Sequence, residues 1–184
     1  MDTLTALQSR ISIPRVTGPA PSQVEIDNLY RAALRAPDHA QLRPWRFLQI
    51  EGDALERLGD LFVAASRADN PELSAAAADS IRAKALRAPM IIVTISCPLE
   101  HPKVPELEQD ISAGCATHAM LIAAHAQGIG AVWRTGPFSE HPVVLEGLGL
   151  KPNEKINAML YVGQNTGPQR SLKELDVKDF VKHW

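Results

Sequence analysis

The sequence predicts a single α+β domain in which helices flank a central mixed sheet, and three observations predict it. Segments with the apolar spacing of amphipathic helices alternate with short runs rich in β-branched residues. The run 90–97 is apolar throughout, as in a central strand that is covered on both faces. The chain has 184 residues, 45% of them hydrophobic and 22% charged, which fits one domain over 1–184.

Capping residues and apolar spacing predict the elements of the first half. Ser22 and Glu25 form a capping box ahead of an amphipathic helix that Pro37 ends, and Asp53 and Glu56 repeat the pattern ahead of another helix. The expected elements are, in order, a helix over 3–9, the helix from 22, a strand over 45–51, the helix from 53, a helix over 72–87 and a strand over 90–97.

The second half is predicted around one long helix. Three prolines make 98–105 an irregular connection, and the helix then runs from Pro105 to Gln127, where Gly128 is placed for a left-handed cap. The second half of this helix is apolar or small all round, so we expect it to be buried. Beyond it we expect a short strand over 130–135, a helix over 142–148 closed by Gly149, and a strand over 156–162.

The last twenty residues have weak periodicity but many apolar side chains. Such a tail should dock on this subunit or on a partner, because exposed apolar surface is costly. The apolar residues are Leu172, Leu175, Val177, Phe180, Val181 and Trp184.

Charge and hydropathy exclude several classes of protein. The chain has nineteen Lys and Arg and twenty-one Asp and Glu, which gives a net charge of −2. This charge argues against a protein whose main role is to bind nucleic acid or anionic membranes. The least polar window, 111–126, is too short to span a bilayer, and the first residues lack the apolar stretch of a secretory signal. We therefore expect a cytoplasmic protein whose partners are small molecules or a second copy of itself.

Familiar catalytic and metal motifs are missing. Gly128 and Gly130 follow a helix and lack a third glycine, so neither a Rossmann nor a P-loop motif is present, and no G-x-S-x-G supports a hydrolase. Cys115, His118 and His125 share one side of the long helix, but spacing ties no further ligand to them. Histidines of the core or of an interface are the better interpretation.

Arginine placement is more informative. Residues 31–46 hold four arginines against one aspartate, which fits either a solvated helix face or a ligand site. Arg35 and His39 flank an irregular turn where a ligand can approach. Arg10 and Ser12 close the first helix, and a guanidinium with a hydroxyl there can bind a phosphate.

Three stretches together resemble the nitroreductase flavoprotein family, specifically its short bacterial NAD(P)H nitroreductase branch. They are Arg10-Ile11-Ser12, RAALRAPDHAQLRPWRFLQIEG at 31–52, and EQDISAGCATHAMLIAAHAQGIGAVWRTG at 108–136. The resemblance covers nearly the whole chain in order. Its specificity lies in the combination of A-P-D-H, P-W-x-F and W-R-T-G, because each piece alone is a weak signal.

The resemblance implies a nitroreductase-like fold, an intertwined homodimer with FMN at the subunit interface, and hydride transfer in two half-reactions. NADH or NADPH would reduce the flavin, which would then reduce a nitroaromatic, a quinone or a related small acceptor. No side chain is assigned as an acid or base. The implied FMN residues are Arg10, Ile11, Ser12, Arg35 and His39, with Trp133, Arg134 and Thr135 from the other subunit. The implied nicotinamide contacts are Ala123, Ala124, His125, Ala126, Gln127 and Gly128.

Several positions depart from the family pattern or allow another interpretation. Ile11 stands where many relatives have a second arginine. Arg43 and Arg46 stand where many relatives have a glutamine and a histidine, so the residues that contact the flavin ring and the substrate are left open. Trp45 is more typical of a core anchor than of a flavin contact. Arg170 lies where some relatives place a second phosphate-binding cation.

Two further functions stay open. The first is a flavin-binding protein for storage or sensing with little turnover. The second is a family member that oxidises or dehalogenates a dedicated substrate. Loops around 65–75 and 98–105 would form the substrate cover, and they carry no diagnostic residues.

Overall fold

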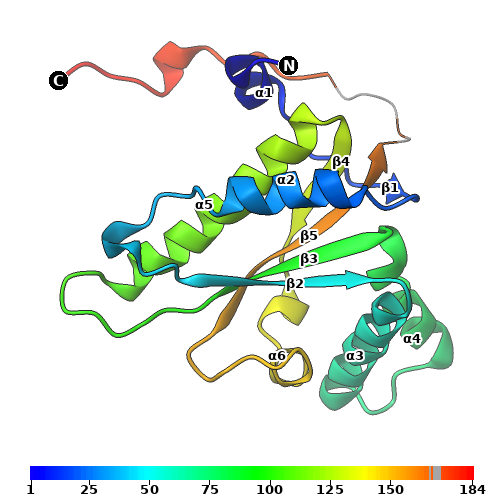
Figure 1. Ribbon diagram of the computed structural model, residues 1–184. Helices are drawn as coiled ribbons and strands as arrows, with labels where there is room; N and C mark the ends of the chain where they lie inside the picture. The colour runs from blue at the N-terminus through cyan, green and yellow to red at the C-terminus, as the bar shows by residue number, and fades with distance from the viewer. Residues whose placement is uncertain (166, 168–170) are drawn as a thin grey trace.

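The computed structural model describes residues 1–165, 167 and 171–184, and it confirms the α+β class. Figure 1 shows α2 and α5 on one face of the sheet and α3, α4 and α6 on the other. The elements are α1 (Thr3–Ser9), β1 (Val16–Thr17), α2 (Gln23–Ala33), β2 (Trp45–Glu51), α3 (Asp53–Asp69), α4 (Ala75–Arg82), β3 (Met90–Ser96), α5 (Glu106–Ala126), β4 (Ile129–Arg134), α6 (Pro142–Gly147) and β5 (Lys155–Asn165).

The strands form one five-stranded sheet. β3 lies between β2 and β5, as expected for its apolar run, and β5 also pairs with β4 and β1. All the pairings among the described strands are antiparallel, so the expectation of a mixed sheet is corrected in this respect. Apolar runs are typical of parallel strands, but β3 shows that an antiparallel strand covered on both faces carries the same pattern.

Side chains of β3 alternate between two hydrophobic cores, one on each face of the sheet. Ile91, Val93 and Ile95 pack with Phe62 of α3, whereas Ile92 packs with residues of α2 and α5. This period of two is the geometry of a strand, in which successive side chains point to opposite faces. Helices therefore cover the sheet on both sides.

Helix starts follow the predictions in part. The capping box of Ser22 and Glu25 is present. The box expected at Asp53 is wrong, because Gly52 is the N-cap of α3, with a φ of 55°, and Asp53 is already the first helical residue. Ser74 caps α4, so this helix is shorter than the predicted 72–87, and Ala85–Arg87 forms a separate 3-10 turn.

The predicted helix ends hold at two glycines. Gly128, with a φ of 76°, follows α5, and Gly149, with a φ of 69°, follows α6. Both lie in the left-handed region that a residue with a side chain rarely adopts.

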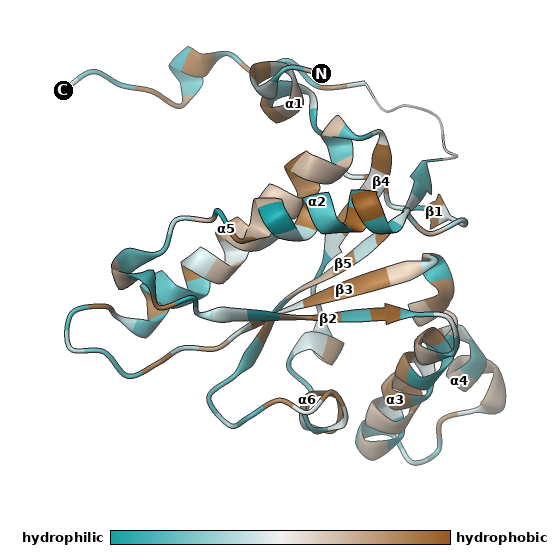
Figure 2. Ribbon diagram, viewed as in Figure 1, coloured by the Kyte–Doolittle hydropathy of each residue, from teal (hydrophilic) through white to brown (hydrophobic). Residues whose placement is uncertain are grey.

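The C-terminal segment does not dock on its own subunit. Residues 171–184 are all exposed, including the side chains of Val177 and Phe180. Figure 2 shows hydrophobic stretches along this segment, which extends away from the body. Arg170 lies outside the described residues. Over the described part of the chain, no helix combines the length and apolar character needed to cross a membrane.

Candidate functional site

The first part of the site is an arm that follows α1. The Asp2 side chain accepts a hydrogen bond from the backbone N–H of Thr5 and so caps the helix, which ends at Ser9. Arg10 then turns the chain into an extended conformation, with a ψ of 129°. Arg10 Nη1 lies 3.5 Å from the Ser12 hydroxyl oxygen, whereas Ile11 packs against the core. The arm thus presents a guanidinium and a hydroxyl together, as expected.

This arm lies beside the end of β4 in the same chain. The backbone N–H of Ile13 donates to the carbonyl of Ala131 at 2.9 Å, and Arg134 Nη2 donates to the carbonyl of Pro14 at 2.8 Å. The arm therefore contacts β4 of its own chain through Ile13 and Pro14. That Trp133, Arg134 and Thr135 reach the flavin from the other subunit stays a prediction.

Three arginines from distant parts of the sequence meet next to this arm. Arg15, Arg87 and Arg134 line a cavity of about 420 Å³ together with Pro14, and none of these lining residues is acidic. The Arg134 Nε is buried and has no hydrogen-bond partner among the described residues. An unpaired buried donor between like charges is costly unless an anion or a carbonyl binds there.

An aromatic ring borders this arginine cluster. The Arg134 guanidinium carbon lies 5.4 Å from the centre of the Tyr161 ring. Burial raises the pKa of Tyr161, although Arg134 and Arg87 act in the opposite direction. The hydroxyl is therefore neutral at physiological pH and adds no negative charge, so the cluster keeps its positive charge.

Arg15 and Arg87 were missed in the sequence. Arg87 lies in the 3-10 turn before β3, far along the chain from Arg15 and Arg134, and only the fold brings the three together. No local signal in the sequence joined them, because the two-residue strand β1 after Arg15 was not predicted.

Trp133 and Arg134 point to opposite faces of the sheet, as neighbours in a strand do. Trp133 is half-buried against the α2–α5 core and lines a groove of about 510 Å³ with Cys115 and His118. Thr135 is exposed and lines a smaller cavity with Arg134 and Phe138. In the parts of the chain that the structure describes, no group of three potential metal ligands is found.

Arg35 and His39 lie in a second region, beyond the end of α2. Both oxygens of the Asp38 carboxylate accept backbone hydrogen bonds, from Leu42 at 3.1 Å and from Arg43 at 2.8 Å. These two hydrogen bonds hold the loop in place. Three of its residues other than glycine have left-handed backbones: Ala40, Gln41 and Arg43, with φ values of 62°, 55° and 51°. Such strain persists only where the surroundings enforce it, and it often marks a functional site.

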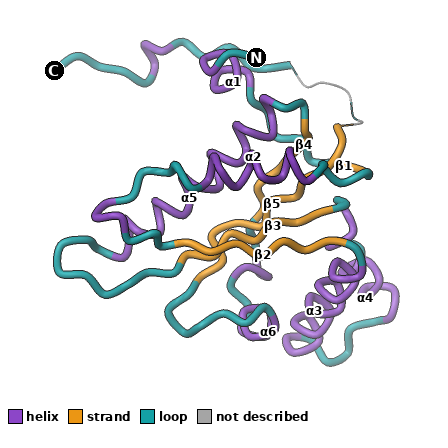
Figure 3. The backbone as a smooth tube through the Cα atoms, in the orientation of Figure 1, coloured by secondary structure: helices purple, strands orange, loops and turns teal. Residues whose placement is uncertain are grey.

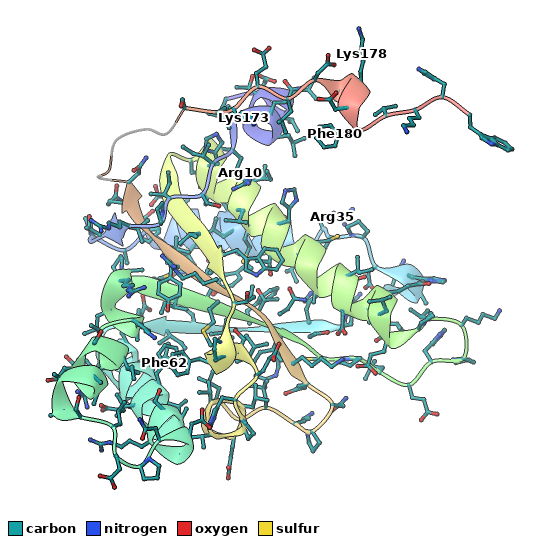
Figure 4. All side chains as sticks on the ribbon, turned by 180° about the vertical axis from the view of Figure 1, so that it is seen from behind. Arg10, Arg35, Phe62, Lys173, Lys178 and Phe180 are labelled. Atoms are coloured by element: carbon teal, nitrogen blue, oxygen red, sulfur yellow. The ribbon has the colours of Figure 1, made fainter. Side chains whose placement is uncertain are left out.

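A cavity opens on this loop. It measures about 520 Å³, and Arg35, Arg43 and Trp45 contribute to its lining. His39 Nδ1 instead lies 2.9 Å from a carboxylate oxygen of Glu108 on α5. Figure 4 shows Arg10 after α1 and Arg35 beyond α2 at separate places, so one chain does not unite all the expected FMN residues.

The segment expected to meet the nicotinamide joins α5 to α1 and α2. Ala124 is fully buried, whereas Ala123 is half-buried and Ala126 is exposed. The Gln127 amide donates to the backbone carbonyl of Glu25, and its oxygen accepts from Asn28. The C-terminal end of a helix carries partial negative charge, which disfavours dinucleotide phosphates, and Gly128 follows that end directly. A nicotinamide contact here stays a prediction.

Arg46, which departs from the family pattern, has a structural partner. Its Nε and Nη2 donate to the two carboxylate oxygens of the buried Glu154, at 3.1 and 2.7 Å. This pairing lowers the pKa of Glu154 to about 2, mainly through the hydrogen bonds from Arg46. Burial raises the pKa of the neighbouring Cys97 thiol to about 11, so that thiol is not a ready nucleophile. The Arg46 guanidinium therefore forms a structural ion pair with Glu154.

The two loops expected to cover the substrate lie at opposite ends of one chain. Figure 3 shows the loop between β3 and α5, which includes 98–105, at one end and the loop between α3 and α4 at the other. Residues 65–69 are the last turns of α3 rather than loop. A single chain therefore cannot close both over one pocket.

Comparisons with known proteins identify the family of the chain. The sequence model of the "Nitroreductase family" matches residues 7–164. The chain is 42% identical over 167 residues to the "Putative NAD(P)H nitroreductase YdjA" of Escherichia coli (strain K12), covering 89% of this chain and 88% of that protein.

Solved structures share the fold. A nitroreductase-like family protein from Bacillus cereus superposes with a TM-score of 0.84 at 20% identity, covering 100% of this chain and 96% of that one. A "putative nitroreductase in complex with fmn" from Desulfovibrio desulfuricans superposes with a TM-score of 0.75 at 24% identity, covering 100% of this chain and 97% of that one.

Proposed function

The chain belongs to the nitroreductase family, and from this premise we propose that it is an FMN-dependent oxidoreductase that takes electrons from NADH or NADPH. One observation carries the proposal. Arg15, Arg87 and Arg134 form a cationic cavity beside the Arg10–Ser12 arm, and this cavity includes a buried donor without a partner. The proposal treats 1–184 as one domain, and it expects the cytoplasm, where both nicotinamide donors are supplied.

The residues of this region fit FMN. FMN has a phosphate and a ring edge with carbonyl oxygens, so it needs an anion site and hydrogen-bond donors. Arg10 and Ser12 supply a guanidinium and a hydroxyl for the phosphate. Arg134 supplies the unpartnered Nε, and Arg15 and Arg87 add positive charge around it. In this proposal the arginine cluster faces the carbonyl edge of the ring.

When bound, FMN supplies a ring that accepts a hydride from the nicotinamide donor and passes electrons on to an acceptor. The chain's own part is to bind, to orient and to stabilise charge. Arg134 is held in place by Pro14, and its guanidinium is therefore pre-oriented. The arginine cluster would favour negative charge on a bound ring, because three cations face the cavity with no lining carboxylate.

A homodimer completes the site in this proposal. Arg35 and His39 lie beyond α2, away from Arg10 and Arg134 of the same chain, so they would reach the flavin from the second copy. The exposed apolar segment 171–184 supports an intertwined assembly, because its side chains have no cover on their own subunit. The family resemblance makes nitroaromatics and quinones the acceptor classes to try first.

The test is to purify the protein and mix it anaerobically with NADH or NADPH. We expect a yellow protein whose flavin absorbance bleaches with at least one donor and returns when an acceptor is added. A colourless protein that does not bind added FMN would overturn the proposal. A yellow protein that neither donor bleaches would instead support the storage or sensing function.

A further inference from the structure

The smaller cavity next to the arginine cluster, which we call the Phe138 cavity, measures about 200 Å³. Arg87 and Arg134 line it as well as the arginine cavity, so the two cavities are neighbours. We propose that the Phe138 cavity is the subsite for the electron acceptor, and that Lys84 and Ser139 make it select aromatic acceptors that carry a carboxylate group. The inference rests on the proposed function, because it names the acceptor class of the same site.

The charges in the lining of the Phe138 cavity favour an anion. Lys84, Arg87 and Arg134 contribute to this lining, and no acidic residue does. Among the described residues the Lys84 ammonium has no ion pair, and it lies 5.1 Å from the centre of the Phe138 ring. The proposed flavin site uses the two arginines but not Lys84. Lys84 is therefore the cation that remains for a second ligand.

Acidic residues that are close in sequence lie outside this lining. Asp60 and Asp79 both pair with Arg82, at 2.7 and 2.9 Å. Glu140 follows Ser139 directly, but it is exposed and does not line the cavity. Water and salt screen exposed charges more than charges that line a cavity. These carboxylates therefore weaken the positive potential of the cavity without reversing it.

Ser139 adds a buried hydroxyl to the lining. This residue is only 5% exposed, and its Oγ has no hydrogen-bond partner among the described residues. Its backbone N–H donates to the carbonyl of Gly136 at 2.8 Å, which holds the residue in a 3-10 turn. A buried hydroxyl without a partner costs stability, whereas a ligand carboxylate could accept its proton.

Aromatic and apolar side chains complete the lining. Phe138 stacks on Phe62 of α3, which Figure 4 labels, with the ring centres 4.4 Å apart. Met159 and Tyr161 of β5 line the same cavity. A flat aromatic ring packs well against such side chains. At about 200 Å³ the cavity is smaller than most sites for drug-sized ligands, so it suits one ring with its acid better than a three-ring flavin.

Lys84 is the residue to test, because the proposed flavin site does not use it. Lys84→Gln removes the positive charge, and Lys84→Arg keeps it. Lys151 is exposed and does not line the cavity, which makes Lys151→Gln a matched control. Ser139→Ala removes a hydroxyl that bonds to none of the described residues, so it should not destabilise the fold.

The experiment measures binding to the oxidised, FMN-loaded protein by calorimetry, with 4-nitrobenzoate and its neutral analogue 4-nitrobenzamide as probes. We expect the benzoate to bind about tenfold or more tightly, because its carboxylate adds charge-assisted hydrogen bonds. Lys84→Gln should remove most of this difference, whereas Lys84→Arg should retain part of it and Lys151→Gln all of it. Ser139→Ala should weaken benzoate binding by roughly fivefold. The ratio of kcat/KM for the benzoate to that for the benzamide should fall in parallel.

The outcomes separate the acceptor subsite from the proposed function. Equal affinity for the two probes in the unaltered protein, or an unchanged difference in a folded Lys84→Gln protein, would overturn the subsite while a yellow, reducible protein upholds the proposed function. Weaker FMN binding in Lys84→Gln would also overturn the subsite, because Lys84 would then belong to the flavin site. A protein that binds no FMN but still prefers the benzoate through Lys84 would overturn the proposed function and uphold the selection of a carboxylate. Far-ultraviolet circular dichroism verifies the fold of each variant.

Discussion

The imidazole of His125 lies 2.9 Å from the hydroxyl of Ser9, which joins the last turn of α5 to the end of α1. The Ser9 hydroxyl donates its only proton to the carbonyl of Thr5, so the His125 Nε2 must carry the proton of the bond between them. Because Arg10 follows Ser9 directly, this bond fixes the point from which the arm that we propose to bind FMN starts.

Removing this bond should loosen the arm. We expect His125→Ala to weaken FMN binding by roughly threefold to tenfold, which corresponds to about 1 kcal/mol for a hydrogen bond. Ser9→Ala should have a similar effect, and the double variant should add little, because both changes break one contact. Fluorescence titration of FMN gives the affinities. Fully additive effects would show that His125 acts on the flavin through another route.

Neutralising the arginine cluster should weaken FMN binding more strongly. Arg134→Gln and Arg87→Gln should each lower the affinity by about tenfold or more, since each removes one cation from a cavity without a lining acid. Arg67, exposed near the end of α3, lies outside that cavity, and Arg67→Gln is the matched control. Equal affinity in the control and in Arg134→Gln would exclude the cluster from the site.

The Glu154–Arg46 pair should make stability depend on acid pH. Pairing lowers the pKa of Glu154 from its ordinary 4.5 to about 2, so its stabilising contribution is complete above pH 4.5 and is lost as the pH falls toward 2. Denaturant unfolding between pH 6 and about pH 3 measures this loss. Glu154→Gln should remove that part of the pH dependence. An unaltered pH profile in Glu154→Gln would mean that other carboxylates cause it.

The C-terminal segment should hold the dimer together. Phe180 and Lys178 are neighbours in this segment, and both side chains are exposed (Figure 4). Phe180→Ser should weaken the dimer, because it removes apolar area that a partner would bury, at about 25 cal/mol for each Å². Lys178→Ser should leave the dimer intact. Light scattering over a dilution series measures both, and identical dimer stability would show that the segment lies outside the interface.

Much of the fold could be predicted from the sequence because local rules set its elements. The strand over 45–51 has the predicted bounds, and the box of Ser22 and Glu25 starts α2 as expected. The start of α3 could not be predicted correctly, because Gly52 adopts a left-handed backbone and takes the place of a side-chain cap. The direction of the strands could not be predicted from local sequence patterns either. A strand that is buried on both faces, such as β3, has the same apolar pattern in a parallel and in an antiparallel sheet.

The candidate site was predictable only where its residues are close in sequence. Arg10 and Ser12 are two positions apart, and Arg35 and Arg43 are eight positions apart. Each pair shares one region of the fold. Arg15 and Arg87 meet only through the pairing of distant strands, so no local signal joined them. The pairing of Arg46 with Glu154 could not be predicted from the sequence either, because the two residues are more than a hundred positions apart.

Arg35 lines the cavity at the start of β2, whereas Arg134 is the last residue of β4. β2 and β4 lie at opposite edges of the sheet. If each flavin site takes one of these arginines from each chain, two defective alleles can complement each other. Homodimers of Arg35→Gln or of Arg134→Gln would be impaired at both sites. In a mixed dimer, one site would contain both substitutions and the other would contain neither. Co-expression of the two alleles should therefore restore a functional site that neither allele produces alone.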